Sequence, residues 1–279
     1  MKVWFADNDL EDACVAIAGI PLDETGTFLP GTHLGAERIR SCAEAVESYS
    51  PYFKMDLSEH KISDIGDMDL KKTESMSRKL ALIREKTGEI MGKGIKPLLL
   101  GGEHTLTLGA VQAVLDQHAD LIVLQLDAHA DLRDVGERGN NMAHDTVMRR
   151  ILDFMDSGSL IQVGLRSFSL EELEVKGIQR YDIDQISDIV KTLDNRPFWL
   201  TFDLDVLDST TMPAVGNPEP AGATYKQVVD LLLELKGKNV VGADLVEFNP
   251  LAADFPAPCV TAANLLRELC CLLVSSSAD

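Results

Sequence analysis

Long hydrophobic runs are missing from this chain, and cysteine and positive charge are scarce. No apolar run approaches the roughly 18 residues of a membrane span, so we expect no membrane segment. The first residues reach the acidic Asp7 too soon for a signal peptide, so we expect no export signal. The five cysteines are odd in number, scattered and without CxxC spacing, which argues against a disulfide framework and a zinc ribbon. These absences favour a reducing, cytoplasmic environment.

Acidic residues outnumber basic ones by a wide margin. The 26 Lys and Arg against 45 Asp and Glu give a net charge of −19. Such a chain repels nucleic acid and anionic membranes, so we expect neither as a partner. The charge would favour a small cationic substrate, although solubility is the simpler explanation of the acidity as a whole. The hydrophobic fraction of 45% is ordinary for a globular protein.

Strand-like and helix-like segments alternate along the chain. Predicted strands span residues 13–20, 62–68, 98–100, 121–126, 160–165, 180–183, 199–202 and 240–246. Predicted helices span residues 35–48, 72–93, 107–116, 146–155, 170–175, 184–193, 225–235 and 262–274. This alternation predicts an α/β fold with a parallel sheet covered by helices on both faces. No linker or repeat divides it, so we expect one domain over residues 1–279, with function in the long loops 131–145 and 208–224.

Four of the predicted strands end in residues that bind metals or carry carboxylates. In chain order these residues are His104; Asp127, His129 and Asp131; Asp203 and Asp205; and Glu247. Ligands of parallel sheets bind just beyond the carboxyl ends of the strands, so one sheet could gather these side chains at one point. Two histidines and four aspartates are too many anions for a dry pocket unless cations hold them together. The pattern therefore predicts a two-metal hydrolytic site.

The donor types indicate which metals would fit. Asp127, His129 and Asp131 alternate, so on an extended backbone they face the same side. Hard oxygen with imidazole and no thiolate favours Mn²⁺, with Zn²⁺, Co²⁺, Ni²⁺ or Fe²⁺ possible. One such pair alone would more simply be a turn or helix-capping aspartate. Three such motifs, each at a strand end, favour a metal site.

Two further residues are candidates for substrate chemistry. His144 lies late in the 131–145 loop, where a neutral histidine suits proton transfer near pH 7; a surface histidine capping the next helix is the equal alternative. Glu247 ends an apolar strand, so we expect it to point into the cleft, where a carboxylate would pair with a planar guanidinium. The Pro- and Gly-rich segment 206–222 predicts a rigid loop that walls the cleft beside Asp205.

Three motifs resemble those of the ureohydrolase family, which includes arginase and agmatinase. They are the GGEHT segment 101–105, the DAHAD segment 127–131 and the TFDLDVLD segment 201–208. The similarity runs from Pro30 near the start to Pro250. It implies a three-layer α/β/α fold with a central, mostly parallel sheet. It also implies a dinuclear manganese centre that hydrolyses a guanidinium group to urea and an amine.

The resemblance assigns roles to residues by motif. One Mn²⁺ would be held by His104, Asp127, Asp131 and Asp203, and the other by Asp127, His129, Asp203 and Asp205, with Asp127 and Asp203 bridging. Asp131 would also accept a hydrogen bond from the nucleophile, His144 would be the proton shuttle, and Glu247 would bind the guanidinium. The trimers and hexamers of the family imply a homo-oligomer.

Within the family the chain is most similar to the agmatinase group. Segments 143–150 and 162–167 resemble agmatinase, so agmatine, giving putrescine and urea, is the leading substrate. Aminopropylagmatine, guanidinobutyrate and arginine stay open, because Asp145, Thr201, Ser209 and Asn217 depart from the family pattern near the expected cleft rim. A zinc deacylase of the same fold and a non-catalytic metal-binding protein stay open as well. Counting the metals and assaying activity would separate them.

Overall fold

An eight-stranded sheet forms the centre of the computed structural model, which describes residues 1–71 and 74–276. Every pairing within this sheet is parallel. In spatial order its strands are β4 (Ile62–Asp67), β1 (Val15–Ile20), β5 (Lys96–Gly101), β10 (Val240–Val246), β9 (Phe198–Asp203), β6 (Ile122–Leu126), β7 (Leu160–Val163) and β8 (Gln179–Tyr181). The predicted parallel sheet is confirmed, and β5, β10, β9 and β6 occupy its middle.

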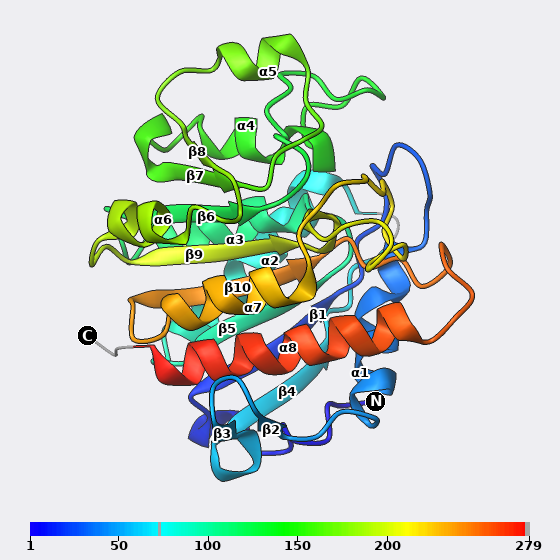
Figure 1. The fold of residues 1–279 in the computed structure, drawn as a ribbon, viewed down its shortest axis with the longest axis vertical. Coiled ribbons are helices and arrows are strands. Elements are labelled where there is room, and N and C mark those ends of the chain that lie inside the picture. Colours follow the sequence, from blue (N-terminus) through cyan, green and yellow to red (C-terminus); the bar gives the residue numbers. More distant parts are fainter. Residues whose placement is uncertain (72–73, 277–279) are drawn as a thin grey trace.

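Helices cover both faces of the sheet. The helices are α1 (Gly35–Ala43), α2 (Met76–Met91), α3 (Leu106–Leu115), α4 (Val147–Ile151), α5 (Leu170–Glu174), α6 (Ile186–Leu193), α7 (Tyr225–Glu234) and α8 (Ala257–Ser275). In Figure 1, α6, α7 and α8 lie in front of the sheet, while α2 and α3 lie behind it. α1 packs against α8, and α4 packs against α3. The three-layer α/β/α architecture predicted from the sequence is confirmed.

The apolar runs of the central strands are explained by burial on both faces. Successive side chains of a strand point to opposite faces. In β5, Leu98 and Leu100 belong to the core packed under α1 and α8, whereas Leu99 belongs to the core packed under α2 and α3. All three side chains are fully buried. A strand that is covered on both sides therefore reads as a continuous apolar run rather than as an alternating one.

Several boundaries differ from the sequence prediction. α2 begins at Met76, after Ser75 caps it by accepting a hydrogen bond from the backbone N–H of Arg78; residues 72–73 of the predicted helix lie outside the described residues. α8 begins earlier than predicted, at Ala257, and carries a proline in its first turn, where the missing N–H costs nothing. A short antiparallel pair, β2 (Tyr49–Ser50) and β3 (Met55–Asp56), was not expected, because two-residue strands leave no periodic signal.

α8 is the described helix that bears on the expectation of no membrane segment. Among the described helices, it alone is long and apolar enough by length and composition to cross a membrane. Most of it is buried inside the protein, where it packs on α1, α7 and β10. It also carries Arg267 and Glu268, whose side chains pair with each other in the interior. These contacts are those of a core helix.

A disulfide joins Cys42 of α1 to Cys259 of α8. The sequence analysis argued against a disulfide framework and did not predict this one pair. The two residues are 217 positions apart, so only the packing of α1 against α8 brings their Cα atoms within 6.0 Å. The disulfide also removes the support that the cysteine pattern gave to a reducing compartment.

Candidate metal centre

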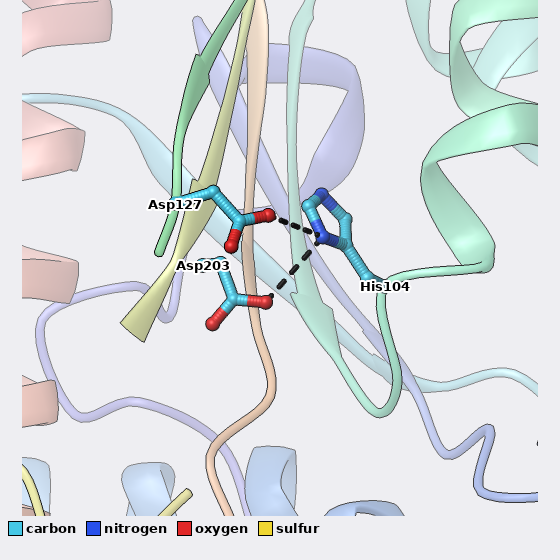
Figure 2. A group of neighbouring side chains, drawn as sticks. All are labelled: His104, Asp127 and Asp203. Atoms are coloured by element: carbon cyan, nitrogen blue, oxygen red, sulfur yellow. Dashed lines mark ion pairs between the residues drawn. The ribbon is translucent and has the colours of Figure 1, made fainter. Parts of the chain in front are cut away.

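The six predicted ligands meet at the carboxyl ends of three central strands, β5, β6 and β9. His104 follows β5, Asp127 follows β6, and Asp203 is the last residue of β9. Figure 2 shows these three side chains converging from their separate strands. The imidazole Nδ1 of His104 lies 3.2 Å from Oδ2 of Asp127, 3.1 Å from Oδ2 of Asp131 and 3.4 Å from Oδ2 of Asp203. The juxtaposition predicted from the strand ends is therefore present in the fold.

A second group of donors adjoins the first. Nδ1 of His129 lies 2.9 Å from Oδ2 of Asp205 and 3.7 Å from Oδ1 of Asp127. His104, Asp127 and Asp203 form one group that could hold a metal ion, and Asp127, His129 and Asp205 form another. Asp127 belongs to both groups. This sharing is the arrangement expected when one carboxylate bridges two ions.

The surroundings of His104 fit a metal ligand. Its Nδ1 atom is buried and has no hydrogen-bond partner among the described residues, although three carboxylate oxygens face it. Two donors about 2.1 Å from one ion and at right angles to each other lie about 3 Å apart, which is close to the spacing seen here. Oxygen and imidazole donors also match the preferences of Mn²⁺ and its neighbours in the first transition series. The residues present therefore fit a divalent metal.

The orientation of His104 is fixed by groups that the sequence analysis did not single out. The hydroxyl of Thr201 donates to Oδ1 of the fully buried Asp244, over 2.7 Å, so its oxygen accepts from Nε2–H of His104, over 2.8 Å. Asp244 also accepts from Trp199 and Thr107. Because the proton of His104 then sits on Nε2, Nδ1 presents its lone pair to the three carboxylates. Partners of this kind set the tautomer of metal-binding histidines.

The role of Asp244 can be tested by truncation. We expect Asp244→Ala to weaken Mn²⁺ affinity about 10- to 100-fold, because His104 loses the chain that orients it. The variant should also melt at a lower temperature, since three buried donors lose their acceptor. Asp244→Asn, which keeps a carbonyl acceptor, should recover part of the affinity. Titration with Mn²⁺ followed by calorimetry measures this, and an Asp244→Ala protein with unchanged affinity would show that the position is only structural.

Strained backbone positions aim two of the site residues. Asp131 has φ of 53° and Glu247 has φ of 65°, a left-handed region that residues other than glycine seldom adopt. Such strain persists only where the surroundings fix it, and it clusters at functional sites. For Glu247, its backbone N–H donates to the carbonyl of Gly102, and its Oε1 accepts from the N–H of His104 over 2.7 Å. The side chain is thereby turned toward His104 and the candidate ligands.

The carboxyl groups of the cluster cannot all ionise equally in the protein alone. Burial and the neighbouring charge of Asp127 raise the pKa of Asp131 to about 7. Burial likewise raises the pKa of Asp203 far above its usual range. In contrast, hydrogen bonds and the charges of His104 and His129 lower the pKa of Asp127 despite its burial. Divalent cations would favour the ionised form of every carboxylate and remove this conflict.

His144 lies beside the cluster rather than within it. It is largely buried, its backbone N–H donates to the hydroxyl of Thr25, and its Nδ1 lies 4.0 Å from Oε1 of Glu247. Burial lowers the pKa of its imidazole, although the charges of Asp145 and Glu103 oppose this, and its Nε2 atom has no partner among the described residues. The structure thus places His144 beside the cluster and Glu247. It begins a short helical turn, but it is buried and Ala143 is the cap residue, so it is not the surface helix cap of the alternative interpretation.

A cavity of about 440 Å³ opens next to these residues. His129, Asp131 and His144 form its inner wall. Asn217, Pro218 and Glu219, from the predicted 208–224 loop, form part of its outer wall, so this loop does border the cleft. The cavity gives a small molecule access to the metal-binding groups.

Known proteins resemble this chain in sequence and fold. The arginase family model matches residues 13–271. An agmatinase from Bacillus anthracis is 34% identical over 277 residues, covering 96% of this chain and 95% of that protein. A guanidinobutyrase from Pseudomonas aeruginosa is 29% identical over 290 residues, covering 96% and 88%. The crystal structure of an agmatine ureohydrolase from Thermoplasma volcanium has a TM-score of 0.89 and 31% identity, covering 98% of this chain and 94% of that one. The chain therefore belongs to the arginase family, as an agmatinase-like ureohydrolase.

Proposed function

We propose that this protein is a manganese-dependent enzyme that hydrolyses agmatine to putrescine and urea. One Mn²⁺ would be held by His104, Asp127, Asp131 and Asp203, and a second by the set Asp127, His129, Asp203 and Asp205. The observation that carries the proposal is the buried, unpartnered Nδ1 of His104 facing three carboxylate oxygens at 3.1–3.4 Å. The agmatinases among the relatives support agmatine as the substrate.

The remaining residues would position the substrate and move protons. Two divalent cations, when bound, would supply an activated water and stabilise the negative charge that develops during attack on the guanidinium carbon. Burial raises the pKa of Glu247 well above its usual range, so its carboxyl group would ionise against the positive charge of the substrate. The carboxylate would then bind two N–H groups of the guanidinium and hold that carbon in place. Asp131, on the wall of the cavity, would accept a hydrogen bond from the attacking water and pass its proton on. His144 would help to deliver a proton to the departing amine.

The proposal is tested by a panel of guanidino compounds assayed for urea with Mn²⁺ present. Agmatine should give the highest kcat/KM, ahead of aminopropylagmatine, guanidinobutyrate and arginine. Removal of metal by a chelator should abolish urea release, and Mn²⁺ should restore it. If none of these substrates released urea from metal-loaded protein, the proposed function would be wrong. One zinc per chain together with deacylation would favour the zinc deacylase instead.

The proton-transfer role of His144 makes a separate prediction. We expect His144→Ala to lower kcat by about 10- to 1000-fold, the usual range for a general acid or base. The content of bound manganese should not change, because His144 lies outside the ligand groups. His118→Ala, a substitution outside the cavity, is the matched control. A wild-type kcat for His144→Ala would assign this histidine to the helical turn alone.

Two broader expectations belong to the same proposal. We expect a homo-oligomer, a trimer or a hexamer, which the mass of the native protein in solution would test. We also expect a cytoplasmic enzyme, which fractionation of the source cells would test.

A further inference from the structure

Carboxylates dominate the cavity beyond the candidate metal centre. Those lining it are Asp131, Glu137, Asp145, Glu172 and Glu219, and the only Lys or Arg among its described lining residues is Arg133. A carboxylate in the wall of a substrate cavity can attract a cationic ligand only if no group of the protein already pairs with it. The partners of each carboxylate decide which of them could meet a ligand.

Two of these carboxylates are occupied by the protein itself. Glu137 forms an ion pair with Arg133, at 3.0 Å. Arg133 is therefore not free to pair with another carboxylate of the cavity. Glu172 accepts hydrogen bonds from the backbone N–H of Leu132 through one oxygen and from that of Ser169 through the other. The charge of Glu137 is therefore paired, and both oxygens of Glu172 are occupied by backbone N–H groups.

Two others are committed to the site or to the loop. Asp131 faces His104 within the metal-binding group. One oxygen of Asp145 accepts from the backbone N–H of Glu137, and the other has no partner among the described residues but is buried, so it is not exposed to a ligand in the cavity. Glu219 differs from all of them. Its carboxylate accepts no hydrogen bond from the described residues, and its one ion-pair neighbour among them is Nε2 of His129, at 3.6 Å.

That neighbour would not neutralise Glu219 in the working enzyme. A histidine that binds a metal through Nδ1 is a neutral imidazole, so His129 would carry no charge of its own toward Glu219. The side chain of Glu219 keeps 30% of its surface exposed, on the same cavity as His129 and Asp131. It is therefore an accessible negative charge in the cavity with no counter-charge from the described residues.

The backbone of Glu219 is held firmly. Its carbonyl accepts hydrogen bonds from Nη2 of Arg166, at 3.0 Å, and from the backbone N–H of Ser209, at 3.2 Å. The same guanidinium nitrogen also binds the carbonyls of Asp205 and Leu207, so it links Glu219 to the strand end that carries Asp205. The backbone that carries this carboxylate thus has a fixed place relative to the metal-binding residues, which limits where the carboxylate can lie.

Apolar side chains in the same cavity suit an alkyl chain. Phe28, Phe168 and Pro218 line the same cavity, and both phenylalanine rings are largely exposed to it and to solvent. A cavity that combines apolar side chains with an unpaired carboxylate matches a methylene chain ending in a cation. It does not match a chain ending in a carboxylate, because Glu219 would repel it.

We propose that Glu219 is the specificity-determining residue that binds the terminal ammonium of guanidino-amine substrates and rejects guanidino acids. The inference rests on the proposed ureohydrolase activity and adds to it the residue that distinguishes the two substrate classes. Those classes matter here, because the relatives include both agmatinases and a guanidinobutyrase.

The test compares wild type with Glu219→Gln on three substrates of similar length. Agmatine ends in an ammonium, butylguanidine in a methyl group and 4-guanidinobutyrate in a carboxylate. In Glu219→Gln, the ratio of kcat/KM for agmatine to that for butylguanidine should fall about 10- to 100-fold, mostly through KM, which is the value of one charge-assisted hydrogen bond. The ratio for guanidinobutyrate to butylguanidine should rise. Calorimetry should show a matching loss of affinity for putrescine.

Controls separate this inference from other roles of the residue. Glu219→Asp should recover part of the preference for agmatine. Glu171→Gln removes an exposed charge of α5 that does not line the cavity, and it should leave all ratios unchanged. If Glu219→Gln lowered the three substrates equally and lost manganese, the residue would act through His129 and the inference would be overturned. Unchanged ratios would overturn it as well. Wild-type protein that released urea from none of the three would instead refute the proposed function.

Discussion

Asp127→Ala should lose both bound manganese and urea release, with activity at least about 1000-fold below wild type. Asp127 is the carboxylate common to the two groups of donors, and it lies within 3.7 Å of both histidine Nδ1 atoms. Its removal would therefore weaken both ion sites at once, whereas loss of an outer ligand such as Asp205 would weaken one. Elemental analysis of the dialysed protein and a urea assay measure the two effects.

A matched control separates this effect from general damage. Asp120→Ala changes an exposed aspartate near the opposite end of β6, far along the strand from the cluster, and it should keep both metal and activity. Added Mn²⁺ should raise the melting temperature of wild type and of Asp120→Ala, because a ligand that binds only the folded state stabilises it. It should not do so for Asp127→Ala. An Asp127→Ala protein that retained two ions would refute the bridging role.

Glu247→Gln should lower kcat/KM for agmatine by about 100- to 1000-fold while leaving the manganese content intact. The substitution keeps the shape of the side chain but removes the charge that would pair with the guanidinium, and breaking a buried charged pair costs several kcal/mol. Glu247 is buried and contacts the N–H of His104, so it is close to the cluster without belonging to either donor group.

Substrate affinity and metal content together decide the role of Glu247. Glu234→Gln, at the exposed end of α7, is the control for a lost carboxylate elsewhere. The pattern expected for Glu247→Gln is full metal, a normal melting temperature and weak substrate binding. A kcat/KM within about threefold of wild type would show that the guanidinium is bound by other groups.

The sequence was most informative where chemistry coincided with strand ends. His104, Asp127, Asp203 and Glu247 each follow or end a buried apolar run, and parallel strands bring such positions to one edge of the sheet. This rule alone was sufficient to predict the juxtaposition of the donors. It could not give the left-handed backbone of Glu247, because φ is set by the loop and its contact with Gly102.

Other parts depended on long-range packing and could not be predicted from local pattern. Cys42 and Cys259 give no spacing signal, since two helices distant in sequence bring them together. Asp244 lies within an apolar strand and gives no local signal of its role, which appears only when Thr201 and Thr107 are seen to donate to it. Glu219 was only one residue of a loop expected to wall the cleft, and its significance appears when the other cavity carboxylates prove to be occupied.

The most direct test of the account is a crystal structure of the protein grown with excess Mn²⁺ and measured at a wavelength where manganese scatters anomalously. We expect two manganese peaks per chain. One should be bound by Nδ1 of His104 and the other by Nδ1 of His129, with Asp127 contacting both. A single peak, peaks elsewhere, or no peak at the carboxyl ends of β5, β6 and β9 would contradict it.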